Sequence, residues 1–298
     1  SANTVLTNAV LSSLDHLVLT ANIATLGDTS VGDGAGNTNV GLDINLDGDL
    51  TLAGDITMGD TSNNAGAIAF DGVDGDIILS SGGASDASTI TISTDVSGTD
   101  AAISLGKIED GGSDIALTID AGSANFTTTS TIGASDTIGT LTISAADVIL
   151  GGNIKVGSNN ISITETDAHG IGLGAALGGT AMDITDAELA YLYAQDVTLA
   201  SAGKITVNGV TAGNTGTISG TTTLSSTGEI EFSTAASVFD NALSVSSDDL
   251  VDIDQDVSSA TGNLSINGDA DTDSDSNDQI TIATGVTLAA GGSLSLDA

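Results

Sequence analysis

Residues 230–253 read IEFSTAASVFDNALSVSSDDLVDI, and the fold depends on the pattern in this stretch. Apolar residues alternate with polar ones in three short runs, Ile230-x-Phe232, Leu243-x-Val245 and Val251-x-Ile253. In an extended chain, a period of two places the apolar side chains on one face and Thr, Ser and Asp on the other. The stretch therefore predicts three short, half-buried strands separated by turns.

The same alternation recurs along most of the chain. Successive runs often begin 12 or 13 residues apart, as at 77, 90, 103 and 115, although the spacing is irregular elsewhere. The further runs are Leu42-x-Ile44-x-Leu46, Ile77-x-Leu79, Ile90-x-Ile92, Ile103-x-Leu105, Ile115-x-Leu117-x-Ile119, Ile154-x-Val156, Ile161-x-Ile163, Ile205-x-Val207, Leu264-x-Ile266, Ile280-x-Ile282 and Leu294-x-Leu296.

Short strands at near-regular spacing, with turn residues between them, predict an all-β fold. Aromatic residues make up only 2% of the chain, and Pro is absent. This composition favours an elongated β-solenoid or β-helix-like fold, because stacked Ile, Val, Leu and Ala fill the narrow interior of a coil. A tandem β-sandwich is the alternative, although a sandwich normally contains more aromatic residues and some Pro.

One internal segment departs from the strand pattern. Thr185-Asp-Ala-Glu188 matches a capping box, in which the Thr hydroxyl and the Glu carboxylate each accept the other residue's backbone N–H. The sequence therefore predicts a short helix near 186–195. The residues expected on one face of this helix are Leu189, Leu192 and Tyr193.

The start of the chain also has a helical spacing. Leu6, Val10, Leu14 and Leu17 recur at roughly 3.6 residues and predict a helix that covers one open end of the core, although Val, Thr and Ser are poor helix formers. We predict an N-terminal cap or assembly segment over 1–20. A β-rich segment follows over 21–180, and a second over 181–298 begins with the short helix.

The charge balance excludes several functions. Three Lys and Arg residues face 40 Asp and Glu residues, which gives a net charge of −37. Nucleic-acid binding and binding to anionic membranes are therefore not expected. The absence of Cys excludes disulfides, thiolate metal sites and c-type haem attachment. No apolar run is long enough for a transmembrane helix, so membrane insertion is not expected.

The most acidic stretch, 267–278, reads NGDADTDSDSND. In an extended conformation its alternate carboxylates face the same way about 6 to 7 Å apart, and their repulsion favours a hard divalent cation. The sequence therefore predicts a Ca²⁺ site here. A looped conformation would resemble an EF-hand, but its sixth position lacks Gly and its twelfth is not Glu. A solvated acidic loop is the alternative. The predicted ligands are Asp269, Asp271, Asp273, Asp275 and Asp278.

Asp252 and Asp254 flank Ile253, so both carboxylates should lie on the outer face of one strand. Acidic residues on adjacent coils would then stack about 4.8 Å apart and require counter-ions. We predict that these two residues also bind cations. A solvated, highly soluble face and adaptation to salt are the competing explanations.

Two further groups of residues were weighed for chemistry. His16 and His169 each have an Asp nearby, but a catalytic triad would also need a nucleophile and an oxyanion hole. Surface histidines are the simpler interpretation, and we predict that the chain is not an enzyme. For Lys107, Lys155 and Lys204 we expect ion pairs with neighbouring Asp residues, with an internal Lys–Asn isopeptide bond as the alternative.

Three segments resemble known protein classes. Residues 48–57, GDLTLAGDIT, and 148–156, VILGGNIKV, are similar to repeats of filamentous-haemagglutinin-type secreted adhesins. Residues 184–192, ITDAELAYL, resemble a short segment common in phage tail-fibre proteins. The resemblance implies an extracellular or cell-surface β-rich fibre or adhesin without enzymatic activity, and it assigns no functional residue.

The strand edges predict how such a protein functions. A solenoid ends in unpaired amide and carbonyl groups that bind the next copy by strand addition unless they are capped. We expect a homo-polymer, in which residues 1–20 and Leu294-x-Leu296 meet between copies and cations reduce repulsion between neighbouring fibres. The alternative is a binding module that recognises a carbohydrate or a cell-surface receptor.

Overall fold

A computed structural model describes residues 3–6, 9–12, 16–21, 23–26, 29–32, 40–46, 48–58, 65–80, 89–112, 114–179, 181–271 and 278–298. Before residue 41 and at 45–46, the description covers the backbone alone. The chain divides into two compact units, Ser1–Gly157 and Ser158–Ala298. Each unit is a parallel β-solenoid.

In the first unit the chain visits three parallel sheets in turn and then returns to the first, which completes a coil. The first sheet contains β1 (Asn3–Leu6), β4 (Ile23–Leu26), β7 (Leu50–Leu52), β10 (Ile77–Leu79) and β13 (Ile108–Asp110). The second contains β2 (Ala9–Ser12), β5 (Thr29–Gly32), β8 (Ile56–Met58), β11 (Thr89–Ser93), β14 (Ala116–Asp120) and β16 (Leu141–Ala145). The third contains β3 (His16–Ala21), β6 (Val40–Leu46), β9 (Ala65–Val73), β12 (Ile103–Leu105), β15 (Asn125–Thr128) and β17 (Asp147–Leu150). The short strand β18 (Ile154–Lys155) completes the unit.

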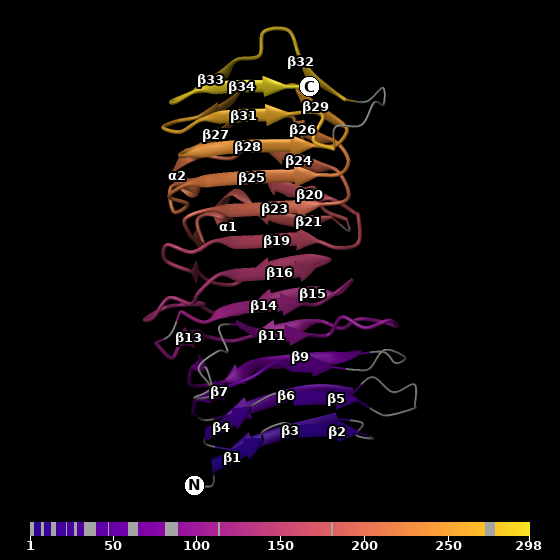
Figure 1. The fold of residues 1–298 in the computed structure, drawn as a ribbon, viewed down its shortest axis with the longest axis vertical. Coiled ribbons are helices and arrows are strands. Elements are labelled where there is room, and N and C mark those ends of the chain that lie inside the picture. Colours follow the sequence, from indigo (N-terminus) through magenta and orange to yellow (C-terminus); the bar gives the residue numbers. More distant parts are fainter. Residues whose placement is uncertain are drawn as a thin grey trace. The chain divides into compact units, whose positions relative to one another are not determined.

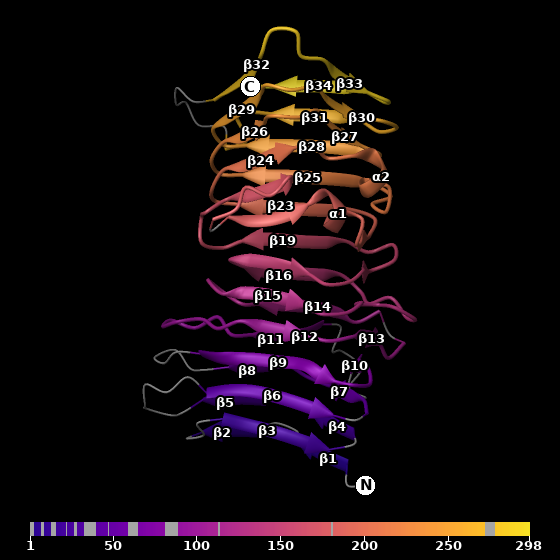
Figure 2. The same ribbon diagram turned by 180° about the vertical axis from the view of Figure 1, so that it is seen from behind.

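The second unit also has three parallel faces, and Figure 1 shows the strands of its longest face side by side in chain order. This face contains β19 (Ile161–Glu165), β23 (Val197–Ser201), β25 (Thr221–Ser226), β28 (Ala242–Ser247), β31 (Leu264–Asn267) and β34 (Leu294–Asp297). The next, clearest in Figure 2, contains β20 (Ile171–Gly174), β21 (Met182–Thr185), β24 (Ile205–Asn208), β26 (Ile230–Phe232), β29 (Leu250–Ile253) and β32 (Gln279–Ile282). The third contains β27 (Ser237–Phe239), β30 (Val257–Ser259) and β33 (Leu288–Ala290). The remaining elements are α1 (Asp186–Leu189), β22 (Leu192–Tyr193) and α2 (Ala212–Thr215).

The core of each unit is a stack of aliphatic columns. In the second unit, Ile205 pairs with Ile230, and Ile230 with Val251, so like residues lie directly above one another in adjacent coils. All three are fully buried. Ile205 and Ile230 are 25 residues apart, so the 12- to 13-residue rhythm marks half a coil here. Phe70, Phe126, Phe232 and Phe239 are also buried and fill single positions in these columns.

Every strand pair whose register is described within the two units is parallel, as in β24 with β26 and β26 with β29. The sheets of a β-sandwich are antiparallel, because short hairpins and Greek-key connections join their strands. The predicted solenoid is therefore confirmed, and the tandem sandwich is not the fold.

The prediction of an N-terminal helix is wrong. Residues 3–6, 9–12 and 16–21 form β1, β2 and β3, which pair in parallel with β4, β5 and β6. The four apolar positions had suggested a helix, but ladder hydrogen bonds to the next coil satisfy the backbone. Val and Thr also favour strands over helices, so tertiary pairing overrides the helical spacing.

The internal helix is confirmed, but it is shorter than predicted. Helix α1 has the capping box: the Glu188 N–H donates to Thr185 Oγ1 at 3.3 Å, and the Thr185 N–H donates to Glu188 Oε2 at 2.9 Å. A tight turn follows, in which the Tyr191 N–H donates to the Glu188 carbonyl at 2.9 Å. Leu192 and Tyr193 therefore lie in β22 and not on a helical face.

The predicted boundary at 180/181 falls inside the second unit, between β20 and β21, which pair in parallel. A second helix, α2, was not predicted. It is a single turn that begins after Thr211, whose N–H and hydroxyl both donate to the Asp186 carboxylate of α1. Asn214 Nδ2 donates to the same carboxylate at 2.7 Å, so one Asp side chain links the two helices.

Candidate functional sites

Many acidic side chains accept backbone N–H groups from the neighbouring coil. Asp49 Oδ1 accepts from the Asp76 N–H at 3.0 Å, and Asp196 Oδ1 accepts from the Thr221 N–H at 2.8 Å. A carboxylate at a corner satisfies a donor that the strand ladder leaves without a partner. Part of the acidic composition is thus structural.

The predicted cation pair Asp252 and Asp254 belongs to a larger cluster. Oxygen atoms of Glu231, Asp252 and Asp254 lie within 4.8 Å of one another, and Glu231 stands directly opposite Asp252 on the adjacent strand. The Thr281 hydroxyl donates to Asp252 Oδ1. The stacking of acidic residues from adjacent coils is as predicted, whereas the contribution of Glu231 was missed.

A lysine partly neutralises this cluster. Lys204 Nζ lies 2.7 Å from Glu231 Oε2 and 3.1 Å from Glu229 Oε1. Burial lowers the pKa of Lys204, but Glu231 and Glu229 outweigh burial and raise the pKa above its ordinary value. The lysine is therefore held charged at the edge of the acidic face.

The structure also brings together three residues of the main predicted site. Oxygen atoms of Asp269, Asp271 and Asp278 lie within 4.8 Å of one another. Asp269 Oδ1 is buried and accepts no hydrogen bond from the described residues. Carboxylate oxygens alone suit Ca²⁺, so this donor set fits the predicted ion. Asp273 and Asp275 lie outside the described residues, and so does most of the looped EF-hand alternative.

Lys107 forms the ion pairs expected for the lysines. Its Nζ lies 2.8 Å from Asp76 Oδ1 and 3.0 Å from Glu109 Oε1. Hydrogen bonds from Lys107 to Asp76 and Glu109 raise the pKa of Lys107 to about 12. Lys204 pairs with two Glu residues instead of the expected Asp, so both ammonium groups bind carboxylates.

Glu109 is a buried carboxylate of β13 that the sequence analysis did not single out. Its Oε2 accepts from the N–H groups of Ser135 at 2.8 Å and Asp136 at 3.0 Å. Burial favours the neutral carboxyl, but the Asp136 N–H, Lys107 and the Ser135 N–H outweigh burial and lower the pKa of Glu109. This carboxylate therefore joins a strand, a loop and a lysine.

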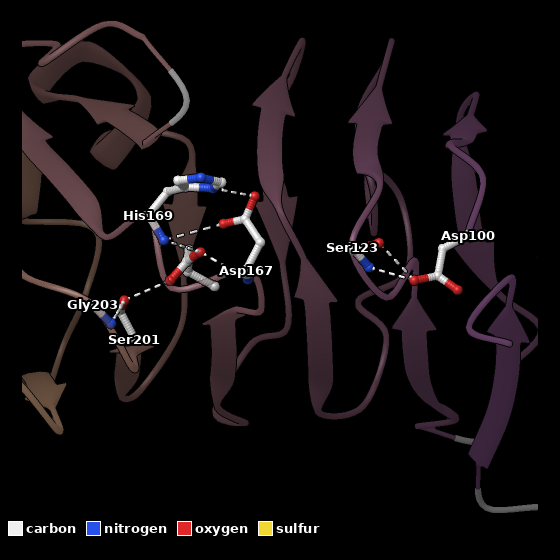
Figure 3. Close-up of polar contacts among 7 residues, drawn as sticks. Asp100, Ser123, Asp167, His169, Ser201 and Gly203 are labelled. Atoms are coloured by element: carbon white, nitrogen blue, oxygen red, sulfur yellow. Dashed lines mark hydrogen bonds and ion pairs between the residues drawn. The ribbon is translucent and has the colours of Figure 1, made fainter. Parts of the chain in front are cut away.

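Glu165, Asp167 and His169 form a third cluster, at the end of β19 (Figure 3). His169 Nδ1 lies 2.5 Å from Asp167 Oδ2. Burial raises the pKa of Asp167, but hydrogen bonds with Glu165 and His169 outweigh burial and lower that pKa. Ser201 Oγ donates to Glu165 Oε2 at 2.6 Å, so the hydroxyl is directed at a carboxylate and not at the imidazole. These residues do not have the arrangement of a Ser–His nucleophile.

Figure 3 also shows a corner of the first unit without metal-binding character. Asp100 Oδ2 accepts from the Ser123 N–H at 2.7 Å and from the Ser123 hydroxyl at 2.8 Å. Asp100 Oδ1 accepts from the Val96 N–H at 2.9 Å. Both oxygens thus have donors from the protein, as expected for a structural carboxylate.

The last coil of the second unit exposes an apolar face. Leu294 and Leu296 of β34 stand in register with the buried Leu264 and Ile266 of β31, yet they are 47% and 46% exposed. Ile282 of β32 pairs with the buried Ile253 and is 45% exposed. In the part of the chain that is described, no strand pairs with the far sides of β32, β33 and β34. Three apolar positions and three strand edges are therefore uncovered.

No protein-family model, curated protein or solved structure matches this chain. The class of protein that the structure defines is thus a parallel, nearly all-β solenoid. Across the described ranges, no helix has the length and apolar character needed to cross a membrane.

Proposed function

We propose that this protein is a structural subunit of an extracellular filament, in which the last coil of one copy is covered by the first coil of the next. The observation that supports the proposal is the uncovered face of β32, β33 and β34. The same columns are fully buried one coil earlier, at Leu264, Ile266 and Ile253. A further parallel coil with aliphatic residues at these positions would bury them.

The first coil of a second copy is a suitable occupant. β1, β2 and β3 are the end strands of their three sheets, and each pairs with a described strand on one side. Their parallel pairing matches the way each coil within the units binds its neighbour. Because the two contacting surfaces differ, the contact is heterologous, and its repetition produces a filament and not a closed dimer.

The experiment compares Leu294→Lys combined with Leu296→Lys against Leu177→Lys. Leu177 is equally exposed, at 47%, but lies in the turn after β20. We expect the wild type and Leu177→Lys to form polymers in sedimentation velocity and negative-stain microscopy, and the double variant to remain monomeric. Circular dichroism controls for folding. A wild-type protein that stays monomeric at every concentration would overturn the proposal.

We further propose that Ca²⁺ stabilises the subunit and bridges filaments at the carboxylate clusters of the second unit. Asp269, with its buried and unbonded oxygen, is the central ligand, and Asp252 and Asp254 supply a second group. The net charge of −37 supports this role, since divalent ions reduce repulsion between like-charged fibres.

Chelation tests the calcium proposal. At a Ca²⁺ concentration of about 100 times the dissociation constant, bound ligand stabilises the folded state by about 2.7 kcal/mol. We expect Ca²⁺ to raise the melting temperature, EDTA to reverse the rise, and Asp269→Asn to reduce it. Asp95→Asn removes one exposed carboxylate of the first unit and should leave the response unchanged. An equal response in Asp269→Asn would contradict the assignment.

A further inference from the structure

The loop after β19 holds three different ligand types close together. Glu165 is the last residue of the strand, and Asp167 and His169 follow in the loop. One ligand atom from each residue lies within 4.8 Å of the other two. This donor set differs from the two other clusters, in which all ligands are carboxylates.

The backbone conformation brings the loop side chains together. Ala168, between Asp167 and His169, has a φ of 59°, in the left-handed region that non-glycine residues rarely adopt. Gly170 follows at a φ of 90°, and a Cβ there would approach the Lys204 carbonyl oxygen to 2.2 Å. The loop is therefore closely packed and held in an unusual conformation.

Glu165 fixes the loop from inside the coil. Its side chain lies at the third inward position of Ile161-x-Ile163-x-Glu165 and is only 2% exposed. Oε1 accepts from the N–H groups of Asp167 at 2.9 Å and His169 at 3.1 Å. One buried carboxylate thus orients both loop ligands through their own backbone.

Ser201 is a positioning residue for Glu165. It pairs with Glu165 across β19 and β23, and its hydroxyl donates to Glu165 Oε2 at 2.6 Å. The Gly203 N–H in turn donates to Ser201 Oγ at 2.8 Å. Hydrogen bonds of this kind to a ligating group are typical of the outer shell of metal sites.

We propose that Glu165, Asp167 and His169 bind one divalent transition-metal ion, of which Zn²⁺ is the representative. Two carboxylates and a neutral imidazole carry a charge of −2, which the ion neutralises. An imidazole ligand favours Zn²⁺ and similar ions over Ca²⁺, which prefers oxygen ligands alone. The ion replaces the proton on His169 Nδ1, which is released to solvent, and water completes the coordination.

The site is accessible from solvent. His169 is 47% exposed, and the Asp167 carboxylate lies between it and the buried Glu165. Ligands about 2.0–2.2 Å from a common ion are separated by about 3–3.5 Å. A small separation of Asp167 and His169 from their present 2.5 Å contact would therefore accommodate the ion. The buried Glu165 need not move for this adjustment.

Titration with Zn²⁺ and with Co²⁺ as a spectroscopic probe tests the site. The background is the Leu294→Lys/Leu296→Lys protein, so a failure of filament assembly does not affect the result. We expect one equivalent of Zn²⁺ by calorimetry and a Co²⁺ visible spectrum showing nitrogen ligation. His169→Gln should abolish that spectrum, and Asp167→Asn should weaken affinity at least tenfold. Ser201→Ala should weaken affinity about 10- to 100-fold, as for outer-shell partners generally.

Matched controls separate this site from the rest of the chain. His16→Gln removes the other histidine, and Asp254→Asn removes a ligand of the carboxylate cluster. Both should bind Zn²⁺ as the background protein does. The inference is overturned if His169→Gln binds Zn²⁺ unchanged, if His16→Gln abolishes binding, or if Ca²⁺ displaces Zn²⁺ at equal concentration.

Discussion

Replacing Phe232 by Ala is expected to lower the free energy of unfolding by about 3–5 kcal/mol, the usual cost of removing a buried aromatic side chain. Phe232 is 1% exposed. Its strand β26 lies between two others, and Phe232 stands in register with Val207 on one side and Ile253 on the other. Ladder hydrogen bonds fix the distance between these strands, so the coil cannot collapse into the cavity.

Urea denaturation followed by circular dichroism measures this change. Tyr193→Ala is the matched control, because Tyr193 is also an aromatic residue of a short strand but is 38% exposed. The control should lose much less stability, since partly exposed side chains gain less from folding. Equal losses in the two variants would mean that the interior of the second unit is not packed as described.

Glu109→Gln is expected to lower the free energy of unfolding at neutral pH by about 1.5–3 kcal/mol, the value of hydrogen bonds to a charged group. The fold lowers the pKa of Glu109 from its ordinary value of 4.5. A carboxyl with a lowered pKa stabilises the fold above its unfolded pKa and loses that contribution as pH falls through its folded pKa. The difference between variant and wild type should therefore be constant near pH 7 and shrink below pH 4.5.

The control for this prediction is Glu229→Gln. Glu229 also pairs with a lysine, at 3.1 Å, but its side chain is partly exposed. Ion pairs at the surface contribute at most about 1 kcal/mol, so the control should change little at any pH. A Glu109→Gln deficit that persists unchanged at pH 3 would show that packing, and not the charge, is responsible.

The alternation of apolar and polar residues was sufficient to predict the strands and the faces they bury. Ile205, Ile230 and Val251 all lie where a period of two places them, and the scarcity of aromatic residues correctly favoured a solenoid. The length of a coil was not predictable, because connections between strands vary. Ile230 pairs with a residue 25 positions earlier and with another 21 positions later.

Local signals predicted helices less well. The capping box correctly located the start of α1, since it depends on neighbouring residues alone. The end of α1 and the whole of α2 depend on contacts with distant residues, such as the hydrogen bonds from Thr211 and Asn214 to Asp186. The first residues have a helical spacing, but pairing with the next coil decides their conformation.

The candidate sites show the same limit. Asp252 with Asp254, and Asp269 with Asp271, are near each other in sequence, so spacing was enough to group them. Glu231 joins its cluster only through the register of β26 and β29. Glu165 had a signal that was overlooked: an acidic residue in phase with Ile161 and Ile163 must point inward, where a carboxylate needs partners.

The pairing of each coil with its immediate neighbours also has a consequence for how the second unit forms. A completed coil displays a row of backbone donors and acceptors that acts as a template for the strand that follows it. Folding can then advance in one direction as a chain is synthesised, and stability accumulates as a sum of nearest-neighbour terms. Such an architecture tolerates the gain or loss of one entire turn more readily than a shift of a few residues within it, so evolution can adjust its length in steps.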